Sequence, residues 1–155
     1  MLKLYKEIEE QLHYWETWES GKDSGVIHKG TIGDRGKDKD IKTDYRNFID
    51  KEIERLVKEG YDAIPLEEHD TLLVEFKIEG NGSKADMERR EKLQELIDHA
   101  LGWTGLGHCE GGTEGDGTME VVCKVVDFSF ASAYIKAGLD GSEFKDYSRV
   151  YKEEK

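Results

Sequence analysis

The chain of 155 residues has one proline, two cysteines and no apolar run near the roughly 20 residues that a membrane-spanning helix needs. It also shows no charged and then apolar leader at its N-terminus. Two cysteines without such a leader are typical of a reducing compartment. These absences predict a cytoplasmic protein with no membrane partner.

Basic side chains are scarce as well. The 23 Lys and Arg residues stand against 35 Asp and Glu residues, which gives a net charge of −12. A negative field of this kind repels phosphate backbones and anionic membranes. It suits a basic protein partner, or it serves solubility alone. A protein is therefore the expected partner, and nucleic acid is disfavoured.

The first part of the chain predicts a small sheet followed by one helix. Alternating and β-branched residues predict strands near 12–19, 26–29 and 38–42, with a glycine-rich loop before the third. Apolar residues at helical spacing predict a helix from about 45 to 58, with an N-cap oxygen just before it. Gly60 stands where a left-handed C-cap residue belongs.

This part resembles the WGR domain over roughly residues 12–66. The resemblance rests on Lys29-Gly30-Thr31-Ile32-Gly33-Asp34-Arg35-Gly36, on the capped helix, and on Lys58-Glu59-Gly60-Tyr61. The family is named for a Trp-Gly-Arg triplet and occurs in DNA-dependent poly-ADP-ribose polymerases and in bacterial proteins. The resemblance implies contact with nucleic acid. However, Lys29 replaces the family tryptophan and Thr31 the arginine, the two positions that help to make that contact.

A local surplus of positive charge lies in this segment. Residues 29–42 hold five basic and three acidic side chains, and the binding candidates among them are Lys29, Arg35, Lys37 and Lys39. Such a cluster suits a phosphate site. A solvated loop of mixed charge is the competing interpretation, and the sequence favours it.

The second part of the chain predicts a β-α-β-β-α-β order, which is typical of a ferredoxin-like sandwich. The expected elements are strands at 71–79, 104–110, 118–127 and 148–151, and helices at 83–102 and 128–138. Ser83 and Asp86 are expected to form a capping box at the start of the first helix. The residues expected to face inward are Met87, Leu93, Leu96, Ile97, Ala100 and Leu101 on the first helix, and Phe130, Ala133 and Tyr134 on the second. The stretches Gly105–Gly112, Gly117–Glu120 and Val125–Asp127 also resemble a bacterial family that implies the same sandwich and no known activity. The predicted class is α+β, with one module at 1–66 and a second at 70–155.

A glycine-rich segment, 111–117, is predicted to be a loop between two strands of the second module. Acidic neighbours and the lack of lysine argue against phosphate binding there. His108, Glu110 and Asp116 are the binding candidates near it. Consecutive strand residues point to opposite faces, so His108 and Cys109 are not expected to share an ion. No metal and no cofactor are predicted.

The predicted loop determines which residues pair across the hairpin, and therefore how far apart the two cysteines are expected to lie. A hairpin that pairs Glu110 with Thr118 places Cys109 opposite Met119 and about 13 Å from Cys123 along the strands. Both thiols are then expected to be free. Because no basic neighbour and no helix start would activate Cys109, a nucleophilic role is not predicted.

Three functional hypotheses remain open. The first is a non-catalytic binding protein with a protein partner, for example an acidic antidote of the immunity-protein kind. The second is a nucleic-acid-associated accessory protein that acts through the WGR-like module. A metal-dependent enzyme is the third.

Overall fold

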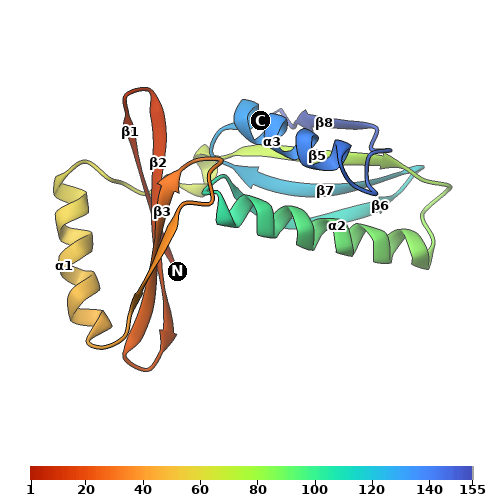
Figure 1. The fold of residues 1–155 in the computed structure, drawn as a ribbon. Helices are drawn as coiled ribbons and strands as arrows, with labels where there is room; N and C mark the ends of the chain where they lie inside the picture. Colours follow the sequence, from red (N-terminus) through yellow and green to blue (C-terminus); the bar gives the residue numbers. More distant parts are fainter. Residues whose placement is uncertain (155) are drawn as a thin grey trace. The chain divides into compact units, whose positions relative to one another are not determined.

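The protein is described here by a computed structural model of residues 1–154, shown in Figure 1. The fold is α+β, with two antiparallel sheets of four strands and three α-helices. The chain divides into two compact units, Met1–Pro65 and the part from Leu66 onward. Within residues 1–154, no helix is both long and apolar enough to cross a membrane.

The first unit is an antiparallel meander with one helix. Its strands pair in chain order, β1-β2-β3-β4, and the helix α1 follows them. The bounds are β1 Leu2–Ile8, β2 Gln11–Gly21, β3 Ser24–Thr31, β4 Lys37–Ile41 and α1 Tyr45–Lys58. The last four elements were predicted from the sequence. Strand β1 was not, because polar residues interrupt its alternation.

The helix α1 lies along one face of this sheet (Figure 1). The buried cluster between them consists of Leu4, Trp15, Ile27, Tyr45, Ile49 and Leu56. At the end of α1, the N–H of Gly60 donates to Val57 O and that of Tyr61 donates to Leu56 O. This is the expected C-cap, with Gly60 at φ 103°. The start differs: Asp44 is the N-cap, but its side chain does not cap the helix.

The backbone of the turn between β1 and β2 is strained. Glu9 and Glu10 have φ values of 52° and 68°, as a two-residue turn of type I′ requires. Non-glycine residues in this region cost about 1–2 kcal/mol each. Glu9→Asn with Glu10→Gly is therefore expected to stabilise the unit by about 1–2 kcal/mol in urea unfolding. Glu9→Gln with Glu10→Gln removes the same charges and keeps the strain, so an equal gain from this control would contradict the explanation.

The second unit follows the order β-α-β-β-α-β, and its sheet has the strand order β6-β7-β5-β8 with antiparallel pairs throughout. A short 3-10 turn, η1, spans Leu66–Glu68. The bounds are β5 Asp70–Lys77, α2 Lys84–Trp103, β6 Gly107–Gly115, β7 Thr118–Val125, α3 Phe128–Asp140 and β8 Arg149–Lys152. Helix α2 begins with a full capping box formed by Ser83 and Asp86.

The prediction of a glycine-rich loop at residues 111–117 is wrong. Residues up to Gly115 continue the strand β6, and only Asp116 and Gly117, at φ 53° and 83°, turn the chain. Gly115 instead of Glu110 therefore pairs with Thr118. The physical reason is that Asp-Gly makes a tight type I′ turn and lets the glycines before it join the ladder.

The predicted separation of the two cysteines is wrong for the same reason. With the longer hairpin, and with a bulge at Glu110, Cys109 is the direct partner of Cys123. Their Sγ atoms lie 3.2 Å apart. Both cysteines are free in the structure.

The predicted buried faces of the second unit's helices are also partly wrong. Helix α3 buries Ala131, Ile135 and Leu139, which recur every four residues. Phe130 and Tyr134, predicted to face inward with Ala133, are 45% and 36% exposed. In α2, Leu93, Ile97 and Leu101 are buried, whereas Met87 and Leu96, also predicted to be buried, are exposed. The apolar residues of α3 occupy more than one stripe, so their spacing alone did not determine which stripe packs.

Candidate functional site

An apolar groove lies between the two helices of the second unit. Its cavity has a volume of about 550 Å³ and is lined by residues of α2, of α3 and of the turn after α3. The lining residues are Leu96, Ile97, His99, Ala100, Tyr134, Ile135, Ala137, Gly138, Leu139 and Ser142. Ligand and peptide sites are typically concave and mostly apolar with few polar groups, which matches this composition.

The floor and the walls of the groove differ in their exposure. Ile97, Ile135 and Leu139 form the buried floor. On the walls, Leu96 of α2 is 52% exposed and Tyr134 of α3 is 36% exposed. Two large apolar side chains therefore face an open cavity, where a partner could cover them. The α3 side is open at Gly138, where a Cβ atom would have no neighbour within 4 Å.

The unit that carries this groove is acidic. The unit from Leu66 onward carries 11 basic and 20 acidic side chains, a net charge of −9. Glu95 lies beside Leu96 on α2 and makes no ion pair within residues 1–154. Lys92, a cation on the same helix, is already paired with Glu143 at 2.6 Å. The groove therefore combines an apolar lining with a position on an acidic unit, and the net charge of that unit favours a basic amphipathic occupant.

The structure brings three of the predicted basic residues together in the first unit. Lys29 pairs with Lys37, and Ile27 with Lys39, across β3 and β4. Cross-strand partners share a face, so all three lysines project on the side of α1. The Nζ atom of Lys39 lies 5.8 Å from the centre of the Phe48 ring.

An acidic residue of α1 lies close to these lysines. Glu52 lines the same small hollow as Lys29, Lys37 and Lys39. The pKa of Glu52 is lowered, first by its hydrogen bond to Arg55, then by the charges of Arg55, Lys29 and Lys39. The lysines thus face a carboxylate as well as solvent, which reduces their attraction for a phosphate.

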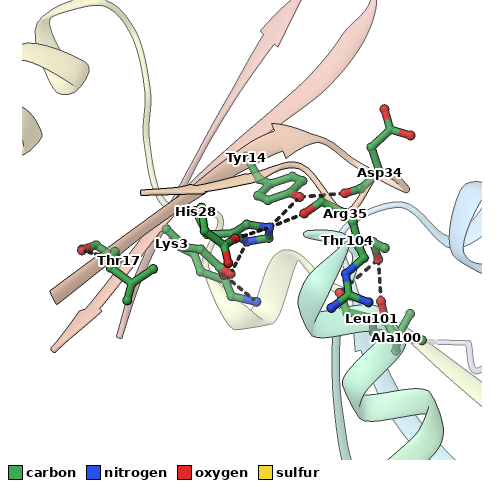
Figure 2. Close-up of polar contacts among 12 residues, drawn as sticks. Lys3, Tyr14, Thr17, His28, Asp34, Arg35, Ala100, Leu101 and Thr104 are labelled. Atoms are coloured by element: carbon green, nitrogen blue, oxygen red, sulfur yellow. Dashed lines mark hydrogen bonds and ion pairs between the residues drawn. The ribbon is translucent and has the colours of Figure 1, made fainter. Parts of the chain in front are cut away.

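Arg35, the fourth predicted basic residue, has a different position. It lies in the loop between β3 and β4 and lines neither of the two hollows that contain Lys29 and Lys37. Figure 2 shows the carbonyl oxygen of Arg35 close to the ring of His28. His28 is fully buried, and its Nε2 atom is hydrogen-bonded to this oxygen. The backbone of Arg35 therefore has a structural role that its sequence position did not reveal.

His28 is the centre of a buried polar network that sequence reasoning did not identify. Its Nδ1 lies 2.8 Å from Glu16 Oε1, and the second oxygen of Glu16 lies 3.4 Å from Lys3 Nζ. Tyr14, next to the ring in Figure 2, donates its hydroxyl to Asp34 O at 2.7 Å. Burial, and then the charge of Glu16, raise the pKa of Tyr14, so the hydroxyl stays a donor. Because His28 is fully buried, this network stabilises the sheet and does not form an open site.

The structure separates the predicted site residues of the second unit. His108 and Glu110 are near each other, with Nε2 and Oε1 3.5 Å apart. Asp116 lies at the opposite end of β6, in the hairpin turn, where its N–H donates to Asn81 Oδ1. Within residues 1–154, no group of three or more His, Cys, Asp or Glu residues is arranged to hold a metal ion.

Comparisons of the chain with protein-family models, with curated proteins and with solved structures found no match.

Proposed function

We propose that this chain is a non-catalytic binding protein, and that its second unit docks a basic amphipathic segment of a partner protein in the groove between α2 and α3. The carrying observation is the exposed pair Leu96 and Tyr134 on the walls of an apolar cavity of about 550 Å³. Large apolar side chains that remain exposed around a concave surface are typical of interaction sites. The net negative charge of the unit favours a basic partner, as an antidote-type immunity protein would require.

Two structural assignments accompany this proposal. The order β-α-β-β-α-β with strands arranged β6-β7-β5-β8 supports a ferredoxin-like second unit. A four-stranded meander covered by one helix supports a WGR-like first unit. Neither fold determines a function by itself, so the proposed function rests on the groove.

The proposal is tested with designed helical peptides of equal length, all with leucine on one face and with either lysine or glutamate on the other. Fluorescence anisotropy is expected to show binding of the lysine peptide and none of the glutamate peptide. Leu96→Asp is expected to weaken binding of the lysine peptide about tenfold or more, because it places a charge in the apolar wall.

The matched control is Met87→Asp. Met87 lies on the same helix, is 47% exposed and does not line the groove. Both substitutions add one negative charge, so a purely electrostatic attraction of the lysine peptide would respond equally to them. If Leu96→Asp binds the peptide as well as Met87→Asp does, the groove is not the docking site.

Binding of nucleic acid through the first unit is the second candidate. It is supported by the three lysines that gather on one face of β3 and β4. A duplex DNA probe in the same titration separates the two functions. Sub-micromolar DNA binding with a steep salt dependence, lost in Lys37→Ala with Lys39→Ala, would favour this candidate over the peptide groove.

A further inference from the structure

The two cysteines of the second unit form a pre-aligned dithiol. Cys109 of β6 and Cys123 of β7 are direct cross-strand partners, with Sγ atoms 3.2 Å apart. Directly opposed residues of antiparallel strands have Cα atoms about 4.5–5.5 Å apart. Disulfides usually join Cα atoms about 4.4–6.8 Å apart. The backbone is therefore already placed for a disulfide between these residues.

Only one of the two thiols can be reached from outside. Cys109 is partly exposed and lines a hollow of about 480 Å³ between α2 and β6. Cys123 is fully buried behind it. A small reagent therefore meets Cys109 first, and Cys123 can react only with a group already attached to Cys109.

The lining of this hollow is acidic. Its charged residues are Arg90, Glu91, Glu95 and Asp98, and Arg90 is neutralised by an ion pair with Glu114. Asp98 accepts the backbone N–H of Cys109 at 2.8 Å. A hydrogen bond to Cys123, then burial, and then charges that include Asp98 raise the pKa of the Cys109 thiol. Because the thiolate is the nucleophile, the first exchange step is slow at neutral pH, and an anionic reagent is further disfavoured.

We propose that Cys109 and Cys123 form a thiol-oxidation site that reacts with small cationic disulfides and closes to an internal disulfide. In the first step, the Cys109 sulfur attacks one sulfur of the reagent, its proton passes to solvent, and one reagent thiolate leaves. In the second, the Cys123 sulfur attacks Cys109 Sγ in the mixed disulfide, its proton passes to solvent, and the other reagent thiolate leaves. Two protein thiols are thereby oxidised, and one disulfide reagent is reduced to two thiols.

The reduced full-length chain is treated with cystamine, a dication, or with oxidised glutathione, an anion, and then alkylated after unfolding. Intact mass is expected to show a product that has lost two hydrogens, takes up no alkylating group and carries no adduct. Cys123→Ser is expected to stop at the mixed disulfide on Cys109. A stable mixed disulfide in the unsubstituted chain, with Cys123 still alkylated, would overturn the internal closure.

The selectivity is measured by dividing each reagent's rate by its rate with the urea-unfolded chain, which removes differences in intrinsic reactivity. Cystamine is expected to react about tenfold faster than glutathione on this scale at low salt. Glu91→Gln and added salt are both expected to reduce the ratio. Equal normalised rates at low salt would overturn the cationic selectivity.

Discussion

The variant His28→Ala is expected to destabilise the first unit by about 3–5 kcal/mol. The imidazole is fully buried, and both of its ring nitrogens face acceptors, Glu16 Oε1 and Arg35 O. Each acceptor lies within hydrogen-bond distance of one ring nitrogen. Without it, the carboxylate of Glu16 keeps only Lys3 at 3.4 Å, and its Oε2 atom already has no hydrogen bond. Most of the cost therefore comes from a buried charge that has lost its partner.

The measurement is urea unfolding in a Trp103→Phe background, where Trp15 and Trp18 report on the first unit. Lys3→Met is the control, because Lys3 is partly exposed and its loss is expected to cost less than about 1 kcal/mol. Replacing both buried partners, as Glu16→Met with His28→Leu, is expected to recover part of the stability lost in His28→Ala. A cost of His28→Ala no larger than that of Lys3→Met would show that the network does not stabilise the sheet.

The elements that could be predicted from the sequence are those with a local signal. Helix α1 has apolar residues at helical spacing and a C-cap glycine at Gly60, and both are present in the structure. The capping box of α2 was equally readable at Ser83 and Asp86. The turn at Glu9 and Glu10 has no such signal, since glutamate is unusual at positive φ, and β1 was not predicted.

The hairpin between β6 and β7 was predicted wrongly although the sequence contains a marker of its turn. Asp116-Gly117 is a strong marker of a two-residue turn, yet the glycines before it suggested a long loop. The error moved the pairing of Cys109 by several residues. A register is a non-local property, so one wrong turn changes every cross-strand neighbour along the hairpin.

The docking groove could not be predicted from the sequence, because it is defined by large apolar side chains that remain exposed. Leu96, Phe130 and Tyr134 were expected in the core, since an apolar residue on an amphipathic helix usually packs inward. Their exposure depends on which stripe of α3 meets the sheet and on the gap between the two helices. Tertiary packing determines both, so helical periodicity alone does not reveal them.

The variant Gly36→Ala is expected to destabilise the first unit by about 2–4 kcal/mol, since it adds left-handed strain to a steric clash. Gly36 has φ +68°, and a Cβ atom there would lie 2.1 Å from Lys29 O and 2.6 Å from the Tyr14 hydroxyl. The first of these atoms belongs to the backbone of β3, so it cannot rotate away. The loop would have to move, and the carbonyl of Arg35, the residue before Gly36, would move away from His28.

Gly60→Ala separates the two contributions. Gly60 also has positive φ, +103°, but a Cβ atom there would meet only the flexible Lys6 side chain, at 3.5 Å. Its substitution is expected to cost about 1–2 kcal/mol, the price of the left-handed backbone alone. Both variants are measured by urea unfolding in the Trp103→Phe background. Because Gly36→Ala moves the same loop that holds His28, its cost should shrink when combined with His28→Ala, and strictly additive costs would show that the clash does not act through this hydrogen bond.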